Sequence, residues 1–127
     1  MNNLIWNIFQ LFCSLINYNE NMSLFNLKNK SILITGSSRG IGKSIAHQCA
    51  LHGANVIISS RKLDACEQTA NDINNEIGKE VAFPIAASIS DENQLEHLVE
   101  STRKQLGKID VLVCNAATNP FMGSMLD

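Results

Sequence analysis

Three glycines lie close together in the segment Thr35–Gly42, whose sequence is Thr-Gly-Ser-Ser-Arg-Gly-Ile-Gly. Glycine takes up positive φ angles at little cost and lets a ligand approach the backbone closely. If a helix begins in this segment, its first N–H groups and its positive dipole end attract phosphate. The spacing G-x-x-x-G-x-G differs from the G-x-G-x-x-G fingerprint and from the P-loop. Because of the three glycines and the expected helix start, we expect this segment to bind the diphosphate of a nucleotide cofactor. The alternative is a merely tight turn. The residues of the expected site are Gly36, Ser38, Arg39, Gly40, Ile41 and Gly42.

A basic pair follows the next apolar run, at the point where dinucleotide-binding folds distinguish NAD from NADP. There an acidic residue accepts hydrogen bonds from the ribose 2′-hydroxyl of NAD, whereas an arginine nearby suits the 2′-phosphate of NADP. This sequence has Ser60, Arg61 and Lys62, with no carboxylate. Arg61, Lys62 and Arg39 can form charge-assisted hydrogen bonds with a phosphate. The pattern favours NADP, and the alternative, a basic first turn on a solvated helix, is disfavoured because basic residues there oppose the helix dipole.

The elements that must position these residues alternate along the chain. Short apolar runs predict strands, and apolar residues at spacings of three and four predict helices between them. The run Ile32–Ile34 is continuously apolar, as expected for a strand that helices cover on both faces. This alternation is typical of βαβ units in an α/β, Rossmann-like, doubly wound parallel sheet. The expected strands are 31–35, 56–58, 81–85 and 110–114, and the expected helices are 41–49, 63–77 and 95–106.

Several details of this sheet can also be predicted. Pro84 lacks an N–H donor, so the third strand should lie at a sheet edge. In the order 3-2-1-4 the fourth strand becomes the opposite edge, and its apolar residues would be exposed. Ser90, followed by acidic residues, predicts the N-cap of the last helix. The spacing of Ile41, Ile45 and Cys49 predicts the buried stripe of the first helix.

These motifs together resemble the classical short-chain dehydrogenase/reductase family, whose T-G-x-x-x-G-x-G turn matches Thr35–Gly42. The family's Asn-Asn-Ala-Gly motif is present in altered form as Cys114-Asn-Ala-Ala117. The resemblance covers residues 27–127 and implies that Asn115, Ala116 and Ala117 line the ribose and nicotinamide side of the cofactor. It also implies that Ser88 and Ile89 lie beside the adenine, where the family commonly has Asp-Val.

The resemblance implies an NADP-dependent oxidoreductase that reduces a small-molecule carbonyl or oxidises a small-molecule alcohol. Intact members of the family are usually homo-oligomeric. The tail Asn115–Gly123 is similar to the NADP-dependent carbonyl and retinal reductases. Family members use a Ser and a Tyr-x-x-x-Lys for catalysis. The only tyrosine here is Tyr18, and its fourth following residue is Met22. We therefore assign no catalytic residue and expect the N-terminal half of such an enzyme, with a non-catalytic nucleotide-binding or interaction module, or a nonfunctional remnant, as alternatives.

Composition restricts the partners. The net charge is −2, and no basic block is present to attract nucleic acid. The four cysteines, at positions 13, 49, 66 and 114, match neither a C-x-x-C metal site nor a dense disulfide scaffold. We therefore expect no nucleic-acid partner, no metal site, free thiols and a cytoplasmic location.

The first 22 residues differ in composition from the rest, because Met1–Asn19 contains no charged residue. The apolar stretch Leu4–Ile16 has 13 residues, too few to span a bilayer. It lacks the flanking charges of a secretory signal or a mitochondrial presequence. Three interpretations stay open: translation from an upstream start with Met22 as the native one, a short apolar helix docked on the domain or a partner, and an interfacial anchor. The expected domain is 23–127.

Overall fold

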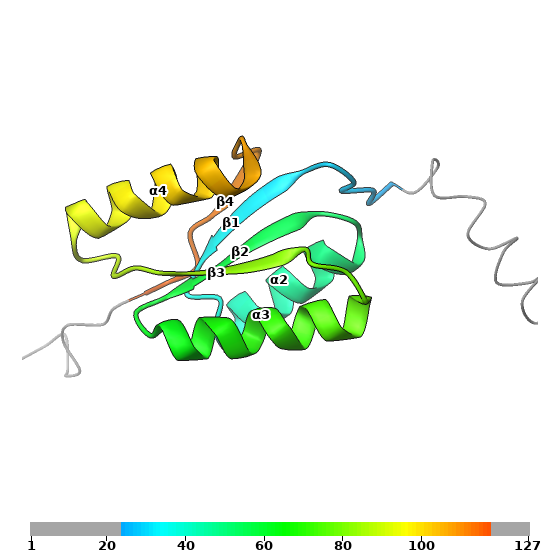
Figure 1. Cartoon of the computed structure of the whole chain (residues 1–127), viewed down its shortest axis with the longest axis horizontal. Helices are drawn as coiled ribbons and strands as arrows, with labels where there is room; N and C mark the ends of the chain where they lie inside the picture. The colour runs from blue at the N-terminus through cyan, green and yellow to red at the C-terminus, as the bar shows by residue number, and fades with distance from the viewer. Residues whose placement is uncertain (1–23, 118–127) are drawn as a thin grey trace, which may run out of the picture.

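The computed structural model describes residues 24–117, which form a parallel four-stranded sheet flanked by three helices (Figure 1). The predicted alternation and the predicted strand order are both confirmed. The sheet order is β3-β2-β1-β4, and the three pairs of neighbouring strands are all parallel. The elements in chain order are β1 (Ser31–Thr35), α2 (Gly40–Leu51), β2 (Asn55–Ser60), α3 (Leu63–Ile77), β3 (Ala82–Ala86), α4 (Glu92–Leu106) and β4 (Val111–Val113).

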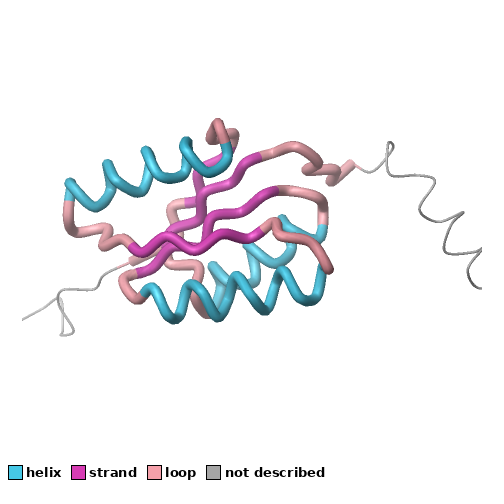
Figure 2. The backbone as a smooth tube through the Cα atoms, in the orientation of Figure 1, coloured by secondary structure: helices cyan, strands magenta, loops and turns pink. Residues whose placement is uncertain are grey.

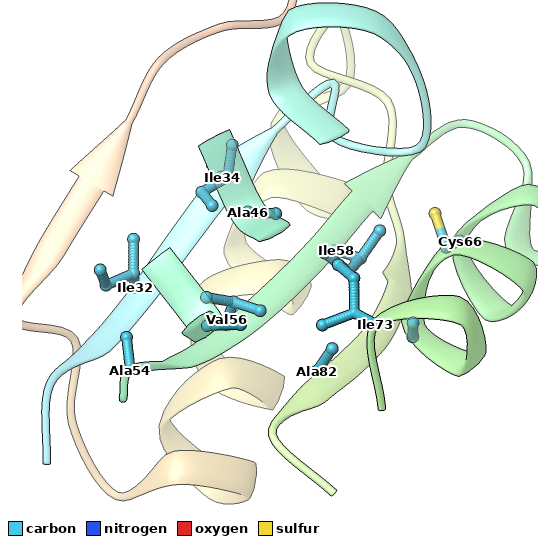
Figure 3. Close-up of a cluster of buried hydrophobic side chains, with 11 residues drawn as sticks. Ile32, Ile34, Ala46, Ala54, Val56, Ile58, Cys66, Ile73 and Ala82 are labelled. Atoms are coloured by element: carbon cyan, nitrogen blue, oxygen red, sulfur yellow. The ribbon is translucent and has the colours of Figure 1, made fainter. Parts of the chain in front are cut away.

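Helices cover both faces of the sheet: α2 and α3 lie on one face and α4 lies on the other (Figures 1 and 2). Alternate residues of each strand point to opposite faces, so each face has its own core. The first core packs against α2 and α3 (Figure 3) and contains Ile32, Ile34, Val56, Ile58, Cys66 and Ile73. The second packs against α4 and contains Leu33, Ile57, Ala87 and Leu98. Burial of each large aliphatic side chain contributes about 1.5–3 kcal/mol to the free energy of folding. The two cores therefore hold in place the strands that carry the candidate site.

The two edges of the sheet lie where the sequence predicts them. β3 is one edge, and Pro84 lies in it opposite Ile58 of β2. β4 is the other edge and is shorter than expected, because its pairing with β1 covers only Val111–Val113. Val111 is 40% exposed and Leu112 is 57% exposed, so the predicted apolar edge is confirmed.

The N-cap of α4 is Asp91, and the prediction of Ser90 is wrong. Asp91 directly precedes the first helical residue, and its carboxylate accepts a hydrogen bond from the Gln94 N–H at 3.2 Å. The Gln94 side chain also donates to this carboxylate and, with that backbone bond, lowers the pKa of Asp91. Ser90 instead donates its N–H to the Ser88 hydroxyl, so it belongs to the preceding loop.

The predicted buried stripe of α2 is also wrong at Ile41, which is 74% exposed. The buried residues of α2 are Gly42, Ala46 and Ala50. These small residues recur every four positions and allow the helix to approach the sheet closely. Ile45 and Cys49 are half-buried on the flank, and burial raises the pKa of the Cys49 thiol. Within residues 24–117, no helix has the length and apolar character needed to cross a bilayer.

Candidate functional site

The glycine-rich turn begins at the carboxyl end of β1 and leaves no room for side chains at two of its glycines. Gly36 has a φ of 64°, and a Cβ placed there would lie 2.8 Å from Ala116 Cα. A Cβ at Gly42 would lie 2.4 Å from the Gly36 carbonyl oxygen and 2.6 Å from Asn115 Nδ2. Both distances are shorter than real contacts allow. Glycine is therefore required at position 36 by conformation and contact, and at position 42 by contact alone.

The residues after β4 hold this turn in place. The Thr35 hydroxyl accepts hydrogen bonds from the N–H groups of Asn115 and Ala116, each at 3.1 Å, and donates to the Val113 carbonyl. The Asn115 side-chain amide donates to the Thr35 and Gly36 carbonyls at 3.1 and 3.0 Å. The structure thus brings Asn115 and Ala116 against the turn that the sequence places some 80 residues earlier.

A second set of hydrogen bonds holds the turn from β2 and α3. Ser37 is fully buried, and its hydroxyl donates to the Ile34 carbonyl at 2.7 Å and accepts from the Ser59 N–H at 2.9 Å. The Ser37 N–H donates back to the Ser59 carbonyl. The Thr69 hydroxyl of α3 donates to the Ser38 carbonyl at 2.9 Å. Sequence reasoning missed Ser37 and Thr69, because both are small polar residues at positions that no spacing distinguishes.

The start of α2 presents backbone donors to solvent. Its N-cap, Arg39, is extended and makes no side-chain capping bond, and the first turn contains no acidic residue. The first N–H groups of a helix have no partner within the helix. Arg39, Gly40 and Ile41 are all exposed. The first turn of α2 therefore has no carboxylate of its own to compete for these N–H groups, and it suits a phosphate group.

The end of β2 carries the predicted basic pair. Arg61 and Lys62 are exposed between β2 and α3, and neither forms an ion pair with any residue in the range 24–117. The Ser60 hydroxyl is half-buried and accepts a hydrogen bond from the Lys62 N–H at 3.4 Å. It also lies 3.2 Å from Cys66 Sγ, and burial raises the pKa of that thiol. The two cations are thus available, and Ser60 anchors the turn that bears them.

The end of β3 lies beside the end of β2, because the Ala87 N–H donates to the Ser60 carbonyl at 2.9 Å. Ser88 and Ile89 follow and are half-buried. The Ser88 N–H donates to the Gln94 side chain at 2.9 Å, and its hydroxyl accepts from the Ser90 N–H. Ser88 is therefore shaped by its own loop and by the start of α4.

The predicted site residues follow the carboxyl ends of all four strands, because parallel strands end at the same edge of the sheet. The glycine turn and Asn115 meet between β1 and β4, where the strand order reverses. Ligands of open α/β sheets bind in the crevice at this topological switch point. Ala117 is exposed at the end of the described range. The residues that follow it in the predicted tail, and Tyr18, lie outside the described residues.

Comparisons with known proteins agree with this geometry. The family model described as short chain dehydrogenase matches residues 30–125. A human protein, dehydrogenase/reductase SDR family member 4, is 41% identical over 101 residues, which are 80% of this chain and 36% of that protein. The chain therefore spans little more than a third of the length of this relative.

Solved structures show the same fold. A short-chain type dehydrogenase/reductase from Mycobacterium marinum superimposes with a TM-score of 0.74 at 38% identity, over 82% of this chain and 41% of that one. A 3-ketoacyl-(acyl-carrier-protein) reductase from Brucella melitensis, complexed with NADH, gives 0.62 at 35% identity, over 68% of this chain and 33% of that one. The family binds nicotinamide cofactors. From the family model, the relatives and the fold, this chain belongs to the short-chain dehydrogenase/reductase family of oxidoreductases.

Proposed function

We propose that this chain binds NADP(H) as the cofactor-binding part of a reductase that transfers hydride from NADPH to the carbonyl of a small molecule or, in the reverse direction, from an alcohol to NADP+. Two observations carry the proposal: the start of α2 has no side-chain cap, and exposed cations lie at its N-cap and directly after β2. Within residues 24–117, Arg39, Arg61 and Lys62 are exposed and take part in no ion pair. Such a surface favours a ligand with a diphosphate and an additional phosphate.

Each group of residues has its own role in this proposal. The backbone N–H groups of Gly40 and Ile41 bind the diphosphate, and the side chains of Arg61 and Lys62 bind the 2′-phosphate. Ser88 and Ile89 lie beside the adenine ring. The segment from Asn115 to Ala117 lines the ribose and nicotinamide side. The nicotinamide supplies the hydride when the cofactor is bound.

Our proposal assigns no catalytic role to any residue of this sequence. The resemblance calls for a Ser and a Tyr-x-x-x-Lys, and residues 1–127 contain no Tyr-x-x-x-Lys. The human relative is longer than the matched region, because that region is 36% of its length. We therefore assign the cofactor site, and no catalytic residue, to the 127 residues of this sequence.

A cytoplasmic location stays part of the proposal. Its support is the chemistry of the thiols, since Cys49, Cys66 and Cys114 form no disulfide within the described range 24–117. Free thiols persist in reducing compartments.

A titration of the full chain with NADPH and with NADH, followed by nucleotide fluorescence and thermal melting, tests the cofactor proposal. We expect saturable NADPH binding that raises the melting temperature, with weaker binding of NADH because no carboxylate at the β2 end accepts its ribose hydroxyls. Equal affinity for the two nucleotides would remove the NADP assignment. No binding of either would overturn the proposed function.

A second candidate function follows from one observation, the exposed apolar edge of β4 at Val111 and Leu112. An unpaired edge strand can pair with a strand from another chain. The chain would then act as a nucleotide-binding module within a larger assembly. This candidate would be supported over the first if the full chain were isolated in a stable complex with another protein chain, and if that complex bound NADPH but had no reductase activity.

A further inference from the structure

We propose that Thr69 is a positioning residue for the diphosphate: its hydroxyl holds the Ser38 carbonyl toward α3 and so directs the Arg39 N–H toward the bound anion. The inference rests on the proposed function, because it assigns a role within the same cofactor site. Thr69 lies in the second turn of α3, is 1% exposed, and donates to the Ser38 carbonyl at 2.9 Å. The bond joins residues 31 positions apart.

The direction of this hydrogen bond is unusual for a buried helical threonine. The hydroxyl of such a residue commonly donates to the carbonyl four residues earlier in its own helix. Thr102 of α4, which is fully buried, does this and donates to the Leu98 carbonyl at 2.7 Å. Thr69 instead donates across to the turn. Among residues 24–117, Thr69 and Thr102 are the buried threonines, and Thr69 is the one whose hydroxyl reaches the turn.

Because the peptide bond is planar, the hydrogen bond from Thr69 to the Ser38 carbonyl also sets the direction of the Arg39 N–H. In a trans peptide the C=O of one residue and the N–H of the next point in opposite directions. Because the Ser38 carbonyl points to α3, the Arg39 N–H points away from α3. This N–H has no hydrogen-bond partner within residues 24–117. It therefore adds a donor to those at the start of α2.

The same bond keeps an acceptor away from the anion. A carbonyl oxygen that faced the diphosphate would repel it, and the Thr69 hydroxyl holds this oxygen on the opposite side. The preceding residue is fixed separately, since Ser37 is bonded to Ile34 and Ser59. Loss of the Thr69 hydroxyl should therefore release the Ser38–Arg39 peptide while the rest of the turn keeps its position.

The test uses the full chain with Thr69→Val, Thr69→Ser and the matched control Thr102→Val. Valine keeps the shape of threonine and removes the donor, whereas serine keeps the donor and removes a methyl group. We expect Thr69→Val to weaken NADPH and NADH binding by a similar factor of about five, the value of one ordinary hydrogen bond. Thr69→Ser should restore most of the affinity even where its melting temperature is lower, and Thr102→Val should leave both affinities unchanged.

A second readout needs no nucleotide. In the ligand-free chain, the amide NMR signals of Arg39 and Gly40 should move in Thr69→Val and stay in place in Thr69→Ser and Thr102→Val. If the wild-type chain binds neither nucleotide, the proposed function fails, and these signals alone decide the role of Thr69. Unmoved signals in Thr69→Val would overturn the inference, as would unchanged nucleotide affinity in that variant or an equal loss in Thr69→Ser.

Discussion

At the scale of single residues, the turn after β1 tolerates no side chain at Gly42, where a Cβ would meet the Gly36 carbonyl at 2.4 Å and the Asn115 amide at 2.6 Å. Both neighbours are themselves held by hydrogen bonds, so neither can move without loss of a contact. The close approach of backbone to backbone here shapes the surface that faces a ligand.

Gly42→Ala should therefore destabilise the domain by about 1–3 kcal/mol through overpacking and abolish measurable NADPH binding. Urea denaturation and a fluorescence titration would measure the two effects. The control is Gly78→Ala at the end of α3, where a Cβ meets nothing within 4 Å and the position lies far from the site. That control should lose stability without loss of affinity. A Gly42→Ala chain with wild-type affinity would contradict the geometry of the turn.

The charge at Arg61 should decide between the two nucleotides. Arg61→Asp replaces a cation that can pair with the 2′-phosphate by an anion that repels it and accepts bonds from ribose hydroxyls. We expect the affinity ratio of NADPH to NADH to fall by about tenfold or more, since a charge-assisted bond contributes roughly 1.5–3 kcal/mol. Arg103→Asp on α4 is the control for net charge. An unchanged ratio in Arg61→Asp would refute the role of the basic pair.

At the candidate site, the sequence motifs identify residues that the structure brings together, but they miss two residues that hold the turn in place. Gly36, Arg61 and Asn115 belong to spaced motifs. Ser37 and Thr69 belong to none, because their roles arise from hydrogen bonds to Ser59 and Ser38, 22 and 31 residues away. Such contacts depend on the packing of β2 and α3, which spacing alone does not encode.

At the scale of elements, the carboxylate of Asp110 links the start of β4 to the start of β1 by a hydrogen bond. Asp110 accepts a hydrogen bond from the Ser31 N–H at 2.8 Å and donates its own N–H to the Ser31 carbonyl. The Lys108 ammonium lies 2.9 Å from the same carboxylate. The Ser31 bond, followed by the Lys108 bond, lowers the pKa of Asp110.

This shift gives Asp110 a defined effect on stability. Its pKa is lower in the folded chain than in the unfolded one, so it stabilises the fold above the ordinary carboxyl value of about 3.9 and loses this effect as the pH falls through the lowered value. Asp110→Asn should therefore reduce the drop in melting temperature between about pH 7 and about pH 3. Glu96→Gln, on the exposed face of α4, is the control. An equal drop in wild type and Asp110→Asn would contradict the assignment.

The helices show which patterns the sequence reveals. The spacing of apolar residues predicts α3 with the bounds that it has, because its buried residues include Cys66, Ala70 and Ile73 at helical intervals. The buried face of α2 escapes this reasoning, since it consists of Gly42, Ala46 and Ala50. Small residues allow a helix to approach a sheet closely, but glycine and alanine are too weakly hydrophobic to stand out as an apolar face in the sequence.

At the scale of the whole molecule, β4 is an edge of the described sheet and carries exposed apolar residues. Leu112 is 57% exposed, and within residues 24–117 β4 pairs with β1 alone. Such an edge favours association between chains. We expect the full chain to associate in a concentration-dependent way in analytical ultracentrifugation, and Leu112→Lys to reduce this association. A chain that is monomeric at all concentrations, with or without the substitution, would contradict this expectation.

The order of the strands could be predicted because the alternating pattern is typical of a doubly wound sheet of order 3-2-1-4-5-6, in which the strand that contains Pro84 lies at an edge. The exposure of Val111 and Leu112 followed from that order. The contact between Asn115 and the glycine turn could be expected only from the family motif. Its physical cause is the pairing of β4 with β1, which places the residue after β4 beside the turn after β1.

An NMR titration of the isotopically labelled full chain with NADPH would test the central claim most directly, because it locates the binding surface residue by residue. We expect the amide signals of Gly36–Gly42 and of Arg61 and Lys62 to shift together on saturation. With NADH, the signals of the glycine turn should shift while those of Arg61 and Lys62 respond less. Shifts confined to other surfaces, or no shifts at all, would contradict the assignment of the cofactor site.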